Sequence, residues 1–86
     1  MDKERSEDDP RGLIFEAYRI EGIGPAECRS IYLDWALGMP EGWDMAASTA
    51  RLHARYAAER PDHPMTAVLA EGLERAARKP RRRGRR

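Results

Sequence analysis

Residues 25–37, PAECRSIYLDWAL, decide the fold of this chain. Proline at the first position is typical of a helix start, because an N–H there would have no partner inside the helix. Gly38 follows as a typical helix-ending residue. When the stretch is drawn as a helix, apolar side chains cover most of its circumference: Cys28, Ile31, Tyr32, Leu33, Trp35, Ala36 and Leu37. Such a helix is typical of a central position, so we expect the other helices to pack around it and around Trp35.

Three further helices are predicted, each preceded by an aspartate that can accept hydrogen bonds from the first amides of the helix. They cover residues 10–21 after Asp9, 45–59 after Asp44 and 64–78 after Asp62. No stretch shows the period-two alternation of a half-exposed strand. The expected fold is all-α, a small bundle of three to four short helices with disordered charged termini.

The buried side of each helix follows from helical spacing. The residues expected to face the core are Leu13, Ala17 and Ile20 in the first helix, Met45, Leu52 and Tyr56 in the third, and Met65, Leu69, Leu73 and Ala76 in the fourth.

Length and composition exclude several protein classes. A chain of 86 residues supports one domain with one modest core. It has no apolar run near the roughly 20 residues that span a membrane, and the charged first ten residues are unlike a secretory signal. A single cysteine, Cys28, excludes an internal disulfide and a multi-cysteine zinc site. We expect a cytoplasmic protein, and the excess of Ala and Arg over Lys is typical of a GC-rich bacterial genome.

Charge divides the chain into parts. Residues 78–86 hold seven positive charges and no acid, so the total of +1 leaves −6 on residues 1–77. Like charges without apolar residues predict an extended tail. We therefore expect a disordered segment over residues 1–9, a single helical domain over 10–77 and a disordered Arg-rich tail over 78–86.

The stretch IEGIGPAECRSI, residues 20–31, carries the most specific local pattern. It resembles the helix-hairpin-helix motif, in which a Gly-hydrophobic-Gly hairpin joins two short helices. On that resemblance Gly22 and Gly24 are the hairpin glycines, Ile23 is the buried hairpin residue, and Cys28 and Ile31 are the small and apolar positions of the second helix. The resemblance implies that amides of the hairpin hold a DNA phosphate, with Arg29 nearby.

The hairpin departs from the family pattern in its charge. Glu21 and Glu27 flank the site, and residues 16–34 sum to −2, whereas affinity for DNA comes largely from neutralised phosphates. The alternative is a plain corner between two helices, ended by Gly22 and restarted by Gly24-Pro25, without any ligand.

The tail is the second candidate for nucleic-acid contact, because arginine binds phosphate in bidentate fashion and stays charged. Its basic residues are Arg78, Lys79, Arg81, Arg82, Arg83, Arg85 and Arg86. The tail could equally dock on an acidic protein surface, fold back on the acidic body, or remain solvated.

A protein-binding patch is the third candidate. Four short helices cannot cover every apolar residue of the stretch 25–37, and a patch of Leu33, Leu37, Met39 and Trp43 would mark a partner site or a homodimer face. The alternative is that Trp43 folds back over Trp35 and closes the core.

Metal binding and catalysis have little support in the sequence. Cys28, His53 and His63 are the only soft ligands, and their spacings fit no compact metal site. We expect Cys28 in the core, His63 exposed, and no catalytic residue, cofactor or small-molecule substrate.

Taken together, these patterns predict a small non-enzymatic helical bacterial protein that binds a macromolecule, most plausibly a protein, with the basic tail adding electrostatic attraction. The alternative is a nucleic-acid-binding module that uses the Gly22–Pro25 hairpin together with the tail.

Overall fold

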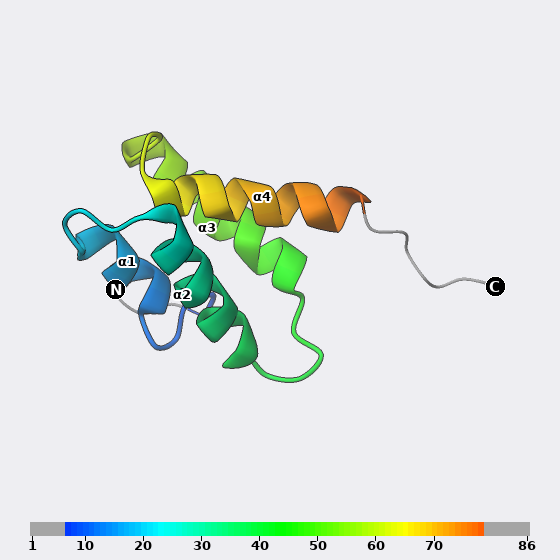
Figure 1. The fold of residues 1–86 in the computed structure, drawn as a ribbon. Coiled ribbons are helices and arrows are strands. Elements are labelled where there is room, and N and C mark those ends of the chain that lie inside the picture. Colours follow the sequence, from blue (N-terminus) through cyan, green and yellow to red (C-terminus); the bar gives the residue numbers. More distant parts are fainter. Residues whose placement is uncertain (1–6, 79–86) are drawn as a thin grey trace.

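The computed structural model describes residues 7–78, which form four helices and no β-strand (Figure 1). The helices are α1 (Leu13–Arg19), α2 (Pro25–Leu37), α3 (Met45–Glu59) and α4 (Pro64–Arg78). The all-α prediction is confirmed, and α2, α3 and α4 have the predicted bounds. The tail from Lys79 to Arg86 lies outside the described residues, as do residues 1–6 with their predicted disorder.

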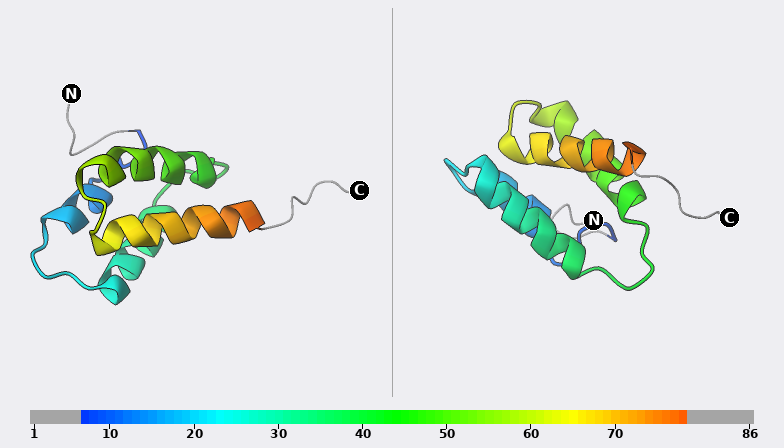
Figure 2. Two further views of the ribbon diagram at one scale, coloured as in Figure 1. Left: turned by 90° about the horizontal axis from the view of Figure 1, so that it is seen from above. Right: turned by 45° about the vertical axis from the view of Figure 1, so that its right-hand side comes forward.

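The helices form two hairpins that pack on each other. The α1–α2 hairpin lies against the α3–α4 hairpin (Figures 1 and 2), and α4 contacts α1, α2 and α3. The expectation that other helices wrap around α2 is wrong for one of its sides, because Leu33 and Leu37 are exposed. Helix α4 joins the two hairpins instead, through its buried residues Met65, Thr66, Val68 and Leu69.

The core confirms some of the predicted buried faces and corrects others. Trp35 and Cys28 are 2% and 0% exposed, as expected for α2, and Leu52 and Tyr56 are buried on α3. On α4 the buried stripe is rotated toward Thr66 and Val68, so that Leu73 is only half-buried and Ala76 is exposed.

Helix α1 is shorter than predicted and turned on its axis. It begins at Leu13 because Gly12 takes a left-handed conformation (φ 69°), which glycine adopts without strain and which ends the turn before the helix. The Asp9 carboxylate does serve the helix start, but from further away, by accepting a hydrogen bond from the Phe15 N–H (3.0 Å). The buried residues are Ile14, Ala17 and Tyr18, whereas Ile20 lies beyond the helix end and is exposed.

The starts of α3 and α4 are capped by different chemistry. Asp44 accepts a hydrogen bond from the Ala47 N–H (3.1 Å), as predicted. At α4 the cap is His63, whose Nδ1 accepts from the Met65 N–H (2.9 Å), so the prediction of Asp62 as the cap is wrong. His63 is half-buried and packs on the Tyr18 ring at 4.4 Å between centroids, which corrects its predicted exposure.

Asp8 and Asp9 belong to the folded domain, which corrects the predicted boundary at Pro10. The main-chain oxygen of Asp8 accepts a hydrogen bond from Trp35 Nε1–H (2.6 Å). Its carboxylate accepts from the Arg51 guanidinium (2.7 and 2.9 Å) and from the Ser48 hydroxyl (2.7 Å). Residues 8–9, here called the N-terminal strap, therefore tie α2 to α3.

Helices α2 and α4 approach closely where Gly72 faces Tyr32. A side chain at position 72 would collide with the Tyr32 hydroxyl, which itself shares a hydrogen bond with the Thr49 hydroxyl (3.1 Å). Glycine at position 72 thus provides the space in which Tyr32 links α2 to α3.

Candidate functional site

The hairpin glycines have the geometry of a tight turn. Gly22 is in the left-handed region (φ 75°), and Ile23 between the glycines is buried, as the resemblance implies. The Gly24 N–H, however, donates to the Glu27 carboxylate (3.1 Å), so a side chain of the protein itself already binds this amide. Arg29 is turned toward α4, where it pairs with Glu71 (3.4 Å). Gly24 and Arg29 thus make internal contacts, and phosphate binding by the hairpin stays a prediction.

The outer side of α2 carries an uncharged stripe. Its members follow the spacing i, i+4, i+7, i+11 and are all exposed: Ala26, Ser30, Leu33 and Leu37. Leu33 is 60% and Leu37 83% exposed, and the two lie one turn apart on the same side of the helix. We call these four residues the outer stripe of α2.

A shallow apolar groove of about 300 Å³ adjoins the outer stripe at Ser30. It lies where the α1–α2 turn meets α2 and is lined by Ile20, Ile23, Glu27, Ser30 and Ile31. The exposed side of Ile20, at 46%, extends the apolar surface beyond the helix itself.

Met39 and Trp43, the other two predicted members of the protein-binding patch, are half-buried. Met39 packs against the core cluster, and Trp43 Nε1–H donates to the Ser48 hydroxyl (2.7 Å). Of the four predicted patch residues, the structure therefore exposes only Leu33 and Leu37.

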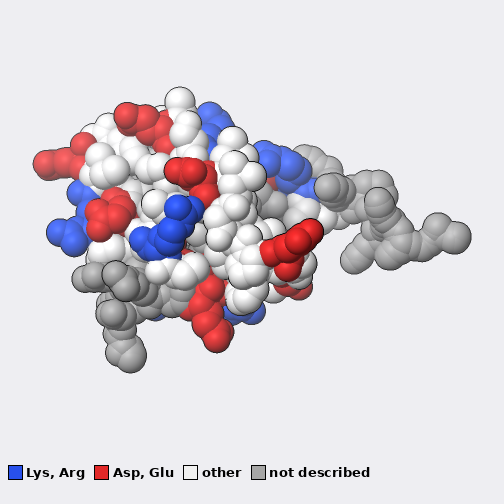
Figure 3. All heavy atoms as spheres, turned by 90° about the horizontal axis from the view of Figure 1, so that it is seen from below, with Lys and Arg blue, Asp and Glu red and all other residues white. Residues whose placement is uncertain are grey.

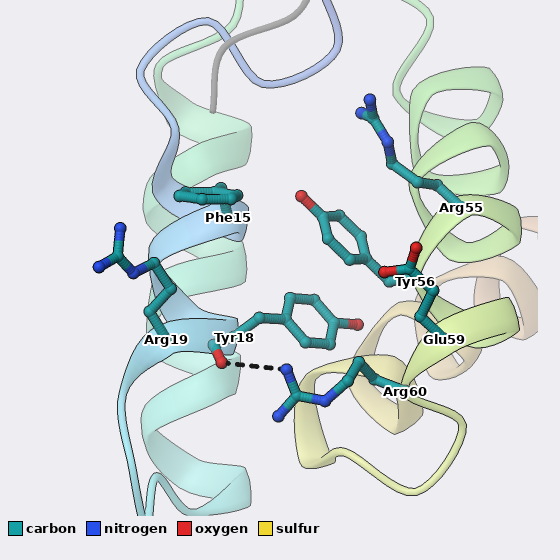
Figure 4. A pocket seen from close by; sticks show the side chains of 7 residues that line it. All are labelled: Phe15, Tyr18, Arg19, Arg55, Tyr56, Glu59 and Arg60. Atoms are coloured by element: carbon teal, nitrogen blue, oxygen red, sulfur yellow. Dashed lines mark hydrogen bonds between the residues drawn. The ribbon is translucent and has the colours of Figure 1, made fainter. Parts of the chain in front are cut away.

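A pocket of about 260 Å³ lies between α1 and the end of α3 (Figure 4). Aromatic rings, arginines and one glutamate line it: Phe15, Tyr18, Arg19, Arg55, Tyr56, Glu59 and Arg60. We call it the Arg–aromatic pocket. The pocket was not predicted from the sequence, because its residues come from two segments, 15–19 and 55–60, that are about 40 positions apart. The spacing of Arg55 next to Tyr56 and of Arg19 next to Tyr18 was the only available signal.

The rings of the Arg–aromatic pocket are held in place by contacts underneath. Tyr18 and Tyr56 stack at 4.2 Å between centroids with 14° between their planes. The Tyr18 hydroxyl shares a short hydrogen bond with Thr66 (2.6 Å), and Thr66 donates to the Arg60 carbonyl (2.8 Å). Burial raises the pKa of Tyr18 to about 12 and also raises the pKa of Tyr56, so both phenols are neutral at physiological pH.

The soft ligands are separate from one another and from this pocket. Within residues 7–78 no group of three or more His, Cys, Asp or Glu side chains is placed to hold a metal ion. Cys28 is fully buried, and burial raises the pKa of its thiol, which disfavours the reactive thiolate. Burial and the neighbouring Arg60 lower the pKa of His63, so its ring is neutral near pH 7.

Charges of both signs are mixed on the side of the molecule where α1 and α2 lie. Figure 3 shows acidic and basic side chains interspersed there, with uncharged surface around them. Such a mixture gives no extended field of one sign on that face, so recognition there depends on local contacts.

Comparisons of the chain with protein-family models, with curated proteins and with solved structures return no match. In the part of the chain from residue 7 to residue 78, none of the helices has the length and apolar content needed to cross a bilayer.

Proposed function

We propose that this protein is a non-enzymatic helical module that binds a helical segment of a protein partner along the outer stripe of α2. The observation that carries the proposal is the exposure of Leu33 and Leu37 on a helix whose opposite side carries the buried Cys28 and Trp35. Full burial of a leucine contributes about 1.5–3 kcal/mol. Covering most of these two side chains would therefore supply several kcal/mol to an interface.

The spacing of the outer stripe suits a helical partner. Residues at i, i+4, i+7 and i+11 form one seam along a helix, which is the arrangement that packs against a second helix. Ala26 and Ser30 are small and allow close approach at the first two turns, whereas the two leucines provide apolar area at the last two. The neighbouring groove at Ile20 and Ile31 would receive one apolar side chain of the partner.

Charge beside the stripe indicates the kind of partner. Glu27 and Asp34 border it on one side, and both are exposed. Arg29, on the other side, is already paired with Glu71. A partner helix with an apolar seam and lysine or arginine on its flank would complement this border, and charge complementarity of that kind mainly sets specificity and association rate.

A photo-crosslinking amino acid at position 33 tests the proposal in cells of the source organism. We expect one discrete protein adduct from position 33 and none from position 58, an exposed alanine on α3 that serves as the matched control. Leu37→Glu should abolish the adduct while leaving the circular dichroism spectrum unchanged, because Leu37 is 83% exposed. An adduct of twice the chain mass would identify the partner as a second copy.

Equal crosslinking from positions 33 and 58 would argue against the proposal, since it would indicate random collisions. An adduct at position 33 that persists in the Leu37→Glu variant would also contradict the proposal.

The alternative function is a nucleic-acid-binding module that combines the hairpin with the basic tail. It is supported by the seven positive charges in residues 78–86. A gel shift at two salt concentrations separates the contributions: replacing the tail arginines with glutamine abolishes binding if the tail acts alone. Residual binding that is lost in Gly24→Glu would assign the contact to the hairpin.

A further inference from the structure

The Arg–aromatic pocket uses none of the residues of the outer stripe, and it combines two kinds of binding group in one place. The half-buried ring of Phe15 and the largely buried rings of Tyr18 and Tyr56 provide apolar surface. Arg55 and Arg60 provide positive charge on the α3 side, and Arg19 adds a third charge on the outer side of α1 (Figure 4). We propose that this pocket binds a nucleoside phosphate, with the base against the rings and the phosphate on the guanidinium groups. This ligand class departs from the expectation that the protein takes no small molecule.

The arginines of the pocket are available for a ligand, unlike others in the domain. Arg29 and Arg51 each pair with a carboxylate. Within residues 7–78, no carboxylate lies within ion-pair distance of Arg19, Arg55 or Arg60. A guanidinium without an acidic partner keeps its N–H groups for bidentate contact with phosphate.

Each of these guanidinium groups lies beside an aromatic ring that lines the pocket. The guanidinium carbons of Arg19, Arg55 and Arg60 lie 5.6, 5.9 and 5.8 Å from the ring centroids of Phe15, Tyr56 and Tyr18, respectively. These distances fall within the range of cation–π attraction, about 6 Å. Arg60 also donates to the Tyr18 carbonyl (3.4 Å). The positive groups are therefore partly oriented before a ligand arrives, which lowers the entropic cost of binding.

The rings suit a nucleobase. Phe15 projects from α1 and Tyr56 from α3 toward the same space (Figure 4). Stacking on aromatic side chains is the general way in which proteins hold an unpaired base, because every base has a flat π-face. The stacked pair of Tyr18 and Tyr56 gives the pocket a firm floor, since the Tyr18 hydroxyl is fixed by Thr66.

Glu59 is the one acidic residue that lines the pocket, and it has a role in base recognition. A carboxylate repels phosphate, but it accepts hydrogen bonds from the exocyclic amino group of a base, as it does with cytosine. Its place in the pocket lining therefore favours bases that carry an amino group, such as adenine, over uracil.

A second cavity adjoins the pocket and shares lining residues with it. It has a volume of about 490 Å³ and shares Tyr18, Arg19 and Arg60 with the first. The second cavity offers room for a neighbouring sugar-phosphate unit. The nucleoside phosphate could accordingly be a free nucleotide or one unit of a single strand, and the experiment separates these sources.

Titration of the full-length chain with AMP, adenosine and inorganic phosphate, followed by amide NMR shifts, tests the proposal. We expect AMP to bind at least tenfold more tightly than adenosine or phosphate alone, with shifts centred on α1 and the end of α3. Arg55→Ala should weaken AMP binding at least fivefold. Arg75→Ala removes the same charge from an exposed position on α4 outside the pocket, and should change the affinity less than twofold.

Two further variants examine the base. Phe15→Leu keeps an apolar side chain but removes a ring, and should weaken AMP at least threefold without changing the affinity for inorganic phosphate. Glu59→Leu should reduce the preference for AMP over UMP toward unity. A single-stranded oligoadenylate that binds tenfold more tightly than AMP, and is weakened more by Arg55→Ala than by Arg75→Ala, assigns the pocket to a strand. Equal affinity of the oligomer and AMP assigns it to the free nucleotide.

The proposal is overturned if AMP causes no saturable shifts at the pocket. It is also overturned if Arg55→Ala and Arg75→Ala weaken AMP equally, because the effect would then be one of net charge only.

Discussion

The two sides of α2 have similar side chains and opposite surroundings. On the inner side Cys28 and Trp35 are 0% and 2% exposed, whereas on the outer side Leu33 and Leu37 are 60% and 83% exposed. The difference arises from what packs on the helix. Helices α1 and α4 and the N-terminal strap cover the inner side, and no part of residues 7–78 buries the two outer leucines. The apolar side chains of α2 therefore fall into two groups. Those on the inner side stabilise the fold, and those on the outer side form an exposed surface.

Removal of the large inner side chain should have the greatest effect on stability. We expect Trp35→Ala to lower the free energy of unfolding by about 3–5 kcal/mol, because it leaves a cavity in the core. Leu37→Ala on the outer side is the matched control and should change it by less than about 0.5 kcal/mol. Urea denaturation followed by circular dichroism measures both values. Equal losses would mean that the outer side is covered in solution.

The N-terminal strap covers the inner side by way of Asp8, and its loss should have an intermediate effect. We expect Asp8→Ala to lower the free energy of unfolding by about 1–2 kcal/mol, since Ser48 and Arg51 lose a charged acceptor. The exposed leucines on the outer side of α2 make no such contact, so their truncation should have a smaller effect. Thermal or urea unfolding at pH 7 provides the measurement.

The stability that the contact between Asp8 and Arg51 adds should decrease as the pH falls. Hydrogen bonds from the Arg51 guanidinium hold the pKa of Asp8 below its ordinary value of 3.8, so the folded state favours the charged carboxylate. The stability that this group adds is fully present above the pKa of the unfolded chain and is lost as the pH falls through the lower pKa of the folded state. The difference between wild type and Asp8→Ala should therefore shrink on acidification below about pH 4.

The contribution of Asp9 to the free energy of unfolding should change with pH in the opposite direction, which makes Asp9 an internal control. Burial raises the pKa of Asp9 above 3.8, so its protonation on acidification favours the folded state. A difference between wild type and Asp8→Ala that grows toward low pH would contradict the assignment of the Asp8 shift to Arg51.

A smaller loss of stability is expected where α4 approaches the inner side of α2. Gly72→Ala adds a methyl group that collides with the Tyr32 hydroxyl, and we expect a net loss of about 1 kcal/mol after the gain in helix propensity. Tyr32→Phe removes that hydroxyl. In the Tyr32→Phe background, Gly72→Ala should lower the free energy of unfolding by a smaller amount, and a double-mutant cycle measures the difference. Independent effects of the two substitutions would rule out the steric explanation.

Local sequence signals predicted the parts of the fold that depend on neighbouring residues. Pro25, Asp44 and Pro64 placed the starts of α2, α3 and α4, because a cap or a proline acts within one turn. Helix α1 was predicted too long, since the Asp9 carboxylate reaches past Gly12 to the Phe15 amide. Its buried face is formed by Ile14, Ala17 and Tyr18, and Ile20 lies beyond the helix end.

Contacts between residues that are distant in the sequence could not be predicted from local sequence patterns. Asp8 and Arg51 are 43 positions apart, and either could have been a solvated charge. The same holds for the Arg–aromatic pocket, whose rings come together only when α1 meets the end of α3. Leu33 and Leu37 were predicted as surface candidates because four helices cannot cover a whole apolar circumference, whereas the partial burial of Met39 and Trp43 depended on how the loop returns to Ser48.

The two tryptophans have different surroundings, which gives the molecule a pair of intrinsic optical reporters. Trp35 is buried with its indole N–H on the Asp8 carbonyl, and Trp43 is half-buried with its indole N–H on the Ser48 hydroxyl. In a Trp43→Phe variant the remaining fluorescence comes from the indole on which the strap closes. Its emission maximum should shift to the red as soon as the first residues of the domain detach, so strap opening can be timed separately from unfolding of the helices.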